Sequence, residues 1–216
     1  MVIQTPEHQT AQTDIPSSPV VGVLALQGAV EPHRPHIEAA GGSFRKVRTA
    51  EQIRNCDALI IPGGESTTML KLIDRFGLED PLQDIFKSRP VWGICAGSIL
   101  MAQNVTNPVQ KSYGLLPIDI ERNAYGRQID SHYDDVKGYQ VCYIRAPVIT
   151  GIHDHEDSEI LATHEADPVW IRNGRHMATT FHPELNTNHP SPMHVYFLEH
   201  LVSGSLKSHE TAAAPE

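Results

Sequence analysis

The stretch Gly93-Ile94-Cys95-Ala96-Gly97 decides the fold expected for this chain. An apolar run, residues 90–92, precedes it, and helix-forming residues 98–102 follow it. This order predicts a buried strand, a sharp turn and a helix, which is the geometry of a nucleophile elbow. Glycines on both sides permit the backbone angles of such a turn, and a helix N-terminus favours the thiolate form of a cysteine. Cys95 is therefore predicted to be the nucleophile of an acyl-transfer enzyme.

The alternative interpretation of Cys95 is a buried structural thiol near the start of a helix, and one Gly-x-Cys-x-Gly match is only weak support for catalysis. The other two cysteines, Cys56 and Cys142, lie in or beside apolar runs and are predicted to be core residues. Three widely spaced cysteines do not make a disulfide framework, so we expect a reducing, cytoplasmic environment.

Strands and helices alternate through the first half of the chain. Strands are expected at residues 20–26, 44–48, 58–61 and just before Cys95, with helices at about 32–40, 51–55, 68–76 and 81–87. This alternation predicts an α/β fold with a three-layer, mostly parallel, doubly wound sheet of the flavodoxin-like kind, whose sites lie beyond the carboxyl ends of the strands. Because Pro32 and Pro35 both fall in the first helix, that helix is expected to begin near Pro32 or later. Ser66 and Thr67 are expected to cap the third helix.

The second half of the chain is richer in strands. They are expected at residues 115–121, 139–144, 159–163 and 169–172. Asn173-Gly174 is a strong signal for a two-residue hairpin that joins residues 169–172 to residues 176–181. A last helix is expected from about residue 192 to residue 202.

Length and charge limit the class of protein further. The chain has 216 residues, a net charge of -9 and a pI near 5.8, which fit one α/β domain and argue against nucleic-acid binding and against a basic membrane face. No apolar run reaches the length of a membrane span. We expect a disordered extension at residues 1–19, a single domain at residues 20–204 and a disordered tail at residues 205–216.

A cysteine nucleophile needs a base and a group that orients the base. His182 closes a predicted strand, and Glu184 follows two residues later. Residues i and i+2 of an extended chain point to the same face, so Glu184 can bind one ring nitrogen of His182 and leave the other for the thiol. The alternative is a polar turn after an edge strand, which explains the segment less well.

Gly63 and Gly64 follow the predicted strand at residues 58–61 and are candidates for an oxyanion site together with the N–H of Ala96. The alternatives are a glycine-rich turn that caps a helix, and a phosphate-binding loop, whose characteristic spacing is missing. The acidic and histidine-rich residues 153–157 are interpreted as a solvated loop, and we predict neither a metal nor a cofactor.

These motifs together resemble the triad glutamine amidotransferases, and most closely the glutaminase subunits of pyridoxal 5′-phosphate synthase. The matching segments are residues 24–29, 62–68, 95–97, 121–128 and 181–185, with residues 144–147 in addition. The resemblance covers residues 20–203. The segment 121–128 is the one that separates this family from other triad glutaminases.

The resemblance implies a role for each matched residue. Cys95 would attack the side-chain amide of L-glutamine, His182 would move the proton, and Glu184 would hold His182. The resemblance also implies a set of substrate-binding residues, which are Gly63, Gly64, Glu65, Ala96, Arg122, Ile144 and Arg145. The oxyanion would be bound by the N–H groups of Gly64 and Ala96.

The resemblance further implies a partner. In this family, ammonia passes to a (β/α)8-barrel synthase subunit within a large hetero-oligomer that makes the vitamin B6 cofactor. Gln27 and Gly28 correspond to the segment that meets the barrel. Docking completes the oxyanion site, which requires a peptide near Gly63 and Gly64 to change orientation.

The chain departs from the family pattern in three places. Residues 31–36 replace the usual Arg/Ala-Glu-His after Val30, Ser98 stands where an apolar residue is usual, and Ile94 replaces a common Thr before the cysteine. The changes at Pro32, Pro35 and Ser98 motivate one alternative, an inactive scaffold that only binds the synthase. Two others are the glutaminase subunit of another amidotransferase, for histidine or purine synthesis, and a flavodoxin-like nucleotide binder.

Overall fold

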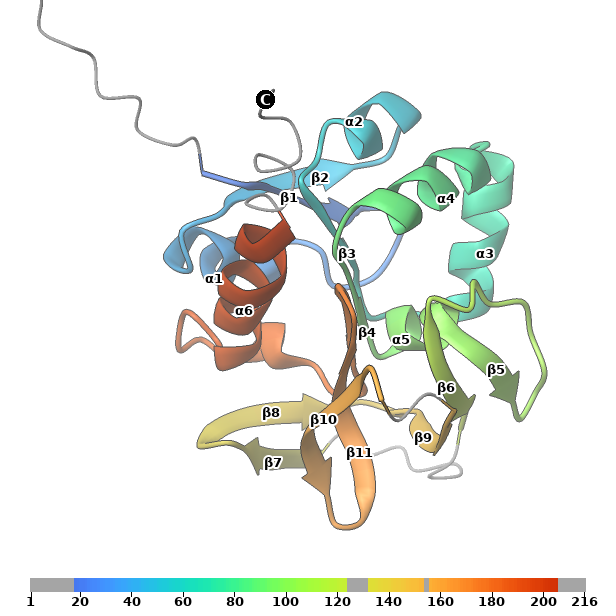
Figure 1. The fold of residues 1–216 in the computed structure, drawn as a ribbon, viewed down its shortest axis with the longest axis vertical. Coiled ribbons are helices and arrows are strands. Elements are labelled where there is room, and N and C mark those ends of the chain that lie inside the picture. The colour runs from blue at the N-terminus through green and yellow to red at the C-terminus, as the bar shows by residue number, and fades with distance from the viewer. Residues whose placement is uncertain (1–17, 124–131, 154–155, 206–216) are drawn as a thin grey trace, which may run out of the picture.

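The central sheet matches the fold expected from the sequence. The computed structural model describes residues 18–123, 132–153 and 156–205. Within these residues the large sheet has seven strands in the order β10-β11-β12-β4-β3-β1-β2 (Figure 1). The strands are β1 (Val20–Leu24), β2 (Ser43–Val47), β3 (Ala58–Ile61), β4 (Val91–Ile94), β10 (Ser158–His164), β11 (Asp167–Asn173) and β12 (His176–Thr179). From β12 to β2 the neighbours are parallel, and β11 runs antiparallel to β10 and β12. The prediction of a mostly parallel α/β sheet is confirmed.

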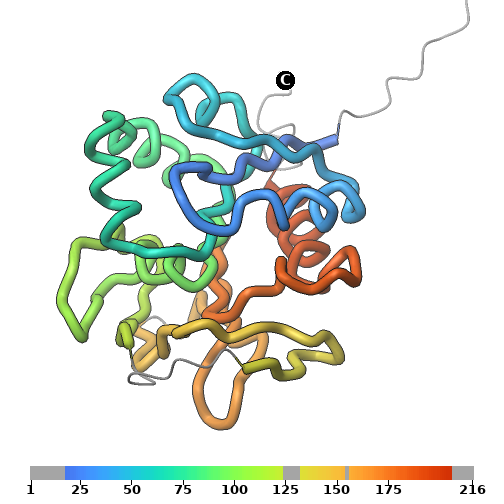
Figure 2. The backbone as a smooth tube through the Cα atoms, turned by 180° about the vertical axis from the view of Figure 1, so that it is seen from behind, coloured from blue at the N-terminus to red at the C-terminus, as the bar shows by residue number. Residues whose placement is uncertain are grey.

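Helices cover both faces of this sheet and make the outer layers. One face carries α1 (His33–Ala39) and α6 (Pro192–Tyr196), which continues as a π-helical turn, η2 (Phe197–Val202). The other face carries α2 (Ala50–Arg54), α3 (Ser66–Arg75), α4 (Glu79–Ser88) and α5 (Ala96–Met101). Although α1 and α6 come from opposite ends of the chain, they lie side by side when the molecule is seen from behind (Figure 2).

Each face of the sheet has its own hydrophobic core. In β3, Leu59 and Ile61 pack towards α3, α4 and α5, whereas Ile60 packs towards α1 and α6. Because both faces are covered, the central strands are continuous apolar runs rather than alternating ones. Their burial is what made them recognisable in the sequence.

Two small sheets extend the second half of the molecule. One contains β5 (Ala102–Thr106), β6 (Leu116–Glu121) and β9 (Val148–Ile152), and the other pairs β7 (His132–Val136) with β8 (Tyr139–Tyr143). Strands β5, β7 and β9 were not predicted. Two of them, β5 and β7, carry polar or charged residues at most positions, so a local pattern does not mark them. Ala102, expected at the end of a helix, instead begins β5.

Local signals set most of the helix ends. Helix α1 begins at His33 with Pro32 at its N-cap, so Pro35 falls in the first turn and the predicted late start is confirmed. The predicted capping of α3 by Ser66 and Thr67 is wrong, because the helix begins at Ser66 and its N-cap is Glu65. A carboxylate can do this because its oxygens reach the free N–H groups of the first turn.

The hairpin between β11 and β12 is confirmed, with its turn one residue later than predicted. Asn173 pairs with His176, so Gly174 and Arg175 form the loop. Gly174 has a φ of 53°, which glycine adopts without strain. The predicted extension and tail fall mainly outside the described residues. In the part of the chain that the structure describes, no helix is long and apolar enough to span a membrane.

Candidate active site

Cys95 lies at the sharp turn between β4 and α5, with φ 49° and ψ -102°. Two hydrogen bonds hold this uncommon conformation: the Cys95 N–H donates to the carbonyl of Thr179 (2.8 Å) and the Ser98 hydroxyl donates to the carbonyl of Cys95 (2.6 Å). Gly97 is required behind the turn, because a β-carbon there would lie 2.0 Å from the carbonyl oxygen of Ile61. A strained non-glycine residue that several contacts hold in place is typical of a functional position.

His182 and Glu184 form a buried pair just beyond β12. The Nδ1 atom of His182 lies 2.7 Å from Oε1 of Glu184. The backbone of His182 is held by Cys142 on β8, whose carbonyl accepts its N–H at 2.8 Å. Glu184 lies in a short 3-10 turn, Pro183–Leu185, and both side chains are almost fully buried. The structure therefore brings these two predicted residues into the arrangement of a base and the group that orients it.

The pair is charged. Burial lowers the pKa of His182, but the neighbouring charges of Glu184 and Cys95 outweigh it and hold this pKa well above its usual value. Burial raises the pKa of Glu184, while the charge and hydrogen bond of His182 lower it, and the net direction is down. A carboxylate beside an imidazolium can stabilise the proton that a base takes from a thiol.

The turn after β3 brings Gly63 and Gly64 beside this pair. A β-carbon at Gly63 would lie 2.1 Å from Cε1 of His182, and one at Gly64 would lie 2.3 Å from Nε2 of Gln27. Gly63 therefore requires glycine, because Glu184 holds the ring of His182 in place, whereas a side chain at Gly64 would displace the end of Gln27. The Gly63 carbonyl accepts the N–H of Ala29 at 3.2 Å. Because a trans peptide directs its C=O and N–H to opposite sides, the N–H of Gly64 points away from Ala29.

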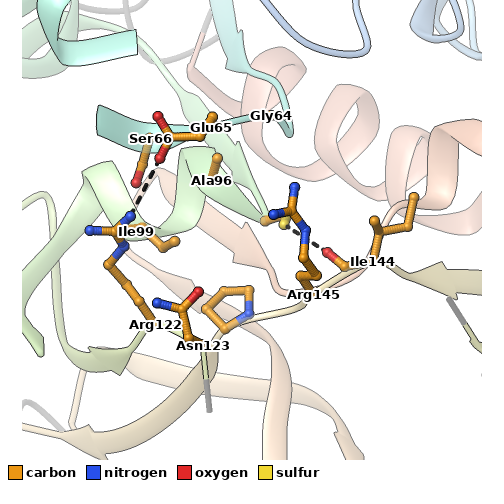
Figure 3. A pocket seen from close by; sticks show the side chains of 11 residues that line it. Gly64, Glu65, Ser66, Ala96, Ile99, Arg122, Asn123, Ile144 and Arg145 are labelled. Carbon is orange, nitrogen blue, oxygen red and sulfur yellow. Dashed lines mark hydrogen bonds and ion pairs between the residues drawn. The ribbon is translucent and has the colours of Figure 1, made fainter. Parts of the chain in front are cut away.

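A hollow opens in front of the thiol (Figure 3). It is lined by Gly64, Glu65, Ser66, Cys95, Ala96, Ile99, Arg122, Asn123, Ile144, Arg145 and Pro147. The predicted substrate-binding residues all line it except Gly63, which lines an adjoining hollow. Four lining residues were not predicted as site residues, although all but Ile99 lie in the segments that carried the resemblance: Ser66, Ile99, Asn123 and Pro147.

Polar groups face this hollow from two sides. The Nη2 atom of Arg122 lies 3.4 Å from Oε1 of Glu65, and its Nη1 atom is buried without a hydrogen-bond partner among the described residues. The thiol of Cys95 lies 3.9 Å from the carbonyl oxygen of Ile144. Arg145 also lines the hollow and has a φ of 46°. The hollow thus combines a guanidinium group that has one unpaired nitrogen with a backbone acceptor, the carbonyl of Ile144.

A second hollow adjoins the first and shares five lining residues with it, Gly64, Glu65, Cys95, Ile144 and Arg145. Gln27, Gly28, Ala29, Gly63, His182 and Leu185 line it, and Leu185 is 40% exposed. Gly28 has a φ of 93°, and Gln27 donates from Nε2 to the carbonyl of Glu65 at 3.2 Å. The two residues predicted to meet a partner therefore contact the candidate oxyanion turn.

Two segments discussed in the sequence analysis, residues 153–157 and 121–128, lie partly or wholly away from the site or outside the described residues. His153 binds Asp119 at 2.8 Å on the surface, and the neighbouring residues 154–155 lie outside the described residues. Residues 124–128, which complete the segment that begins at Glu121, also lie outside them. In the ranges that are described, no group of three or more His, Cys, Asp or Glu side chains has the arrangement of a metal site.

Comparison with known proteins agrees with this geometry and indicates one class, the glutamine amidotransferases. The SNO glutamine amidotransferase family matches residues 23–203, and the chain belongs to this family. The chain is 44% identical over 193 residues to the pyridoxal 5′-phosphate synthase subunit PdxT of Solibacter usitatus, covering 84% of this chain and 98% of the relative. The subunit of the same name from Koribacter versatilis is 41% identical over 191 residues, with 86% and 97% covered. The resemblance seen in the sequence is confirmed.

Solved structures show the same relationship. A crystal structure of a glutamine amidotransferase is 40% identical, with a TM-score of 0.75, and covers 85% of this chain and 98% of its own. A putative GMP synthase subunit from Thermoplasma acidophilum shares only 14% identity at a TM-score of 0.59 over 91% of this chain and 98% of its own. This second likeness shows the fold alone.

Proposed function

We propose that this chain is the glutaminase subunit of a pyridoxal 5′-phosphate synthase. It hydrolyses L-glutamine to L-glutamate and ammonia, and the ammonia serves vitamin B6 biosynthesis. The observation that carries the proposal is the contact of 2.7 Å between His182 and Glu184 beside an elbow cysteine. The identity of 44% to a pyridoxal 5′-phosphate synthase subunit supports the choice among glutaminases.

The chemistry follows from the arrangement of the three side chains. His182 holds the proton that comes from the Cys95 thiol, and the thiolate sulfur attacks the side-chain amide carbon of glutamine. The tetrahedral intermediate collapses as the C–N bond breaks and His182 gives its proton to the departing ammonia. Water then attacks the thioester with His182 as base, which releases glutamate and restores the thiol. Glu184 stabilises the protonated ring of His182 during both steps.

The hollow in front of the thiol suits the rest of the substrate. The unpaired Nη1 of Arg122 is available for the α-carboxylate of glutamine, and Glu65, which holds Nη2 of Arg122, lines the same hollow. The N–H groups of Ala96 and Gly64 are assigned to the developing oxyanion. Gly63 leaves room for the ring of His182, because it has no side chain.

We assign the second hollow to two roles: contact with the partner subunit and the exit of ammonia from the site. A (β/α)8-barrel synthase subunit, in a large hetero-oligomer in the cytoplasm, docks at Gln27 and Gly28. The hydrogen bond from Ala29 to the Gly63 carbonyl links this docking loop to the oxyanion turn. A movement of the loop therefore changes the orientation of the Gly63-Gly64 peptide, and the low steric cost of rotation at glycine permits it.

A glutaminase assay with and without the cognate synthase subunit tests this proposal. Wild type is expected to release glutamate, more rapidly with the synthase, and Cys95→Ala is expected to release none. Cys56→Ala is the matched control, because burial raises the pKa of the Cys56 thiol to about 11 and the residue lies outside the site. Equal ammonia production by wild type and Cys95→Ala would favour the inactive scaffold instead.

A further inference from the structure

The connection from the triad to α6, residues 186–191, is held at both ends by one side chain of α1. Its first residue, Asn186, follows the turn that carries Glu184, and its last residue, Ser191, is the N-cap of α6. The Nε2 atom of His36 lies 3.0 Å from the carbonyl oxygen of Asn186, and Nδ1 of His36 accepts the backbone N–H of Ser191 at 3.0 Å. His36 is fully buried and lies 150 positions before Asn186 in the chain. The steps proposed for glutamine hydrolysis give it no role.

The two backbone partners fix which nitrogen of His36 carries the proton. A backbone N–H can only donate a hydrogen bond and a backbone carbonyl can only accept one. Nδ1 of His36 is therefore unprotonated, and Nε2 carries the proton that it donates to Asn186. Burial lowers the pKa of His36, against the opposing effect of hydrogen bonds to the backbone of Asn186 and of Glu184, so the ring is neutral at neutral pH.

Neighbouring rings hold the His36 ring in this orientation. It stacks on His194 of α6, with ring centroids 4.7 Å apart at 12°, and it meets the ring of His189 edge-on at 4.7 Å and 84°. The hydrogen bond from Ser191 is itself buried, so its loss would leave a buried N–H without a partner, which is costly. Helix α1, which carries His36, is thereby joined to the start of α6 (Figure 2).

Strand β8 holds the same segment through different groups. The carbonyl of Cys142 accepts the N–H of His182 at 2.8 Å, and the carbonyl of Gln140 accepts Nδ2 of Asn186 at 2.8 Å. Asn186 is thus bound at its side chain by β8 and at its carbonyl by α1. Glu184 lies two residues from each of these fixed points, His182 and Asn186. Its contact of 2.7 Å with the His182 ring therefore depends on the backbone between them.

We propose that His36 is a positioning residue of the catalytic centre, which fixes the carbonyl of Asn186 and, through the turn before it, holds Glu184 where its carboxylate meets His182. The inference rests on the proposed function, since it assigns a role to a support of the same triad. His36 belongs to residues 31–36, which depart from the family pattern. That departure therefore supplies a support for the triad.

The two contacts of His36 can be measured without any assay of activity. In full-length ¹⁵N-labelled protein at neutral pH, the ring nitrogen shifts should show His36 protonated at Nε2 and unprotonated at Nδ1. A scalar coupling should also connect Nδ1 to the amide nitrogen of Ser191 across the hydrogen bond. His36→Phe assigns these signals by their loss. A proton on Nδ1 of His36 in the wild type would overturn the proposal, whatever the glutaminase assay shows.

The kinetic test separates the two nitrogens of His36 in the complex with the synthase. His36→Phe keeps a ring but removes both hydrogen bonds, and it should lower kcat at least about tenfold, because a misplacement of about 1 Å can cost about 100-fold. His36→Gln keeps a donor near the position of Nε2 and should recover most of kcat. His36→Asn keeps only an acceptor near the position of Nδ1 and should not. The KM for glutamine should stay within about twofold in all three variants, because His36 lines neither hollow.

Controls separate a positioning role from a general loss of stability. His176→Phe replaces another partly buried histidine, at the start of β12 and away from the triad, and should leave kcat unchanged. In a Glu184→Ala background, His36→Phe should lower kcat by less than about twofold further, because the side chain that it positions is gone.

Two kinetic outcomes would overturn the proposal. One is a full further loss in the Glu184→Ala background, and the other is equal kcat in folded His36→Gln and His36→Asn. If wild type released no glutamate even with the synthase, the proposed function would fail. The ring nitrogen shifts and the coupling to Ser191 would still decide whether His36 holds the segment.

Discussion

At Cys95 the uncommon backbone angle is held from both sides of the peptide. The N–H is bound by Thr179 on β12 and the carbonyl by Ser98 on α5. Ser98, which departs from the apolar residue usual at this position, therefore supports the elbow through a hydrogen bond. The departures at Pro32 and Pro35 also leave the site intact, because both prolines lie at the start of α1.

Gly63 gives the sharpest prediction for a single residue. Gly63→Ala would place a β-carbon 2.1 Å from the ring of His182, which Glu184 and Cys142 hold in place. We expect glutaminase activity in the complex to fall by about 100-fold or more, as a misplacement of about 1 Å costs that much.

The control for this change is Gly204→Ala, where a β-carbon would meet no atom within 4 Å. It should retain wild-type activity. Activity of Gly63→Ala close to the wild-type value would show that His182 does not need its present position.

The N-terminus of α3 combines a structural and a substrate-binding role in one side chain. Glu65 accepts the N–H groups of Thr67 and Thr68 at 3.2 and 2.6 Å, and it also contacts Arg122. Burial raises the pKa of Glu65, but the hydrogen bonds from Thr67 and Thr68 outweigh it and lower the pKa to about 2. Glu65 is therefore charged at any pH at which the protein is expected to work.

Removing the cap of α3 should affect stability and substrate binding together. Glu65→Ala is expected to lower the free energy of unfolding by about 1 kcal/mol, the usual cost of a lost N-cap. It should also raise the KM for glutamine, because Glu65 lines the substrate hollow. Urea unfolding and steady-state kinetics measure the two effects.

The matched control is Thr49→Ala, which removes the capping box of α2 far from the hollow. It should cost similar stability and leave KM unchanged. A KM change of equal size in both variants would assign the effect to stability and not to contact with the substrate.

Over the whole molecule, buried histidines make stability depend on pH. Burial lowers the pKa of His33 and of His176 to about 4, and it also lowers the pKa values of His36 and His194. Below about pH 6.5 these histidines bind protons in the unfolded chain but remain neutral in the folded protein. Stability is therefore lost as the pH falls from 6.5 towards 4. The contribution of His182 has the opposite sign. Because its pKa is raised in the folded protein, His182 adds stability at low pH, and this stability is lost as the pH rises.

The slope of this pH dependence is measurable. Each such histidine contributes about 1.4 kcal/mol per pH unit between its unfolded and folded pKa values. Urea unfolding of wild type at pH 7, 6 and 5 should show that the free energy of unfolding becomes smaller as the pH is lowered. His176→Phe should reduce the slope by about one such contribution. An unchanged slope in that variant would contradict the assignment.

The amino-acid sequence by itself determined the parallel sheet, the elbow at Cys95 and the pairing of His182 with Glu184. These features depend on short-range signals: apolar runs for strands covered on both faces, glycines at turns, and two side chains two residues apart. Such signals act over a few neighbouring residues. The prediction of the family used the same segments.

Only the tertiary structure decided the rest. Strands β5 and β7 are polar and form because distant partners pair with them. Glu65, and neither Ser66 nor Thr67, caps α3. His33 comes to lie beside His194, 161 positions away along the chain, because α1 packs against α6. Contacts between segments so far apart depend on how whole elements pack, and no local pattern of residues encodes them.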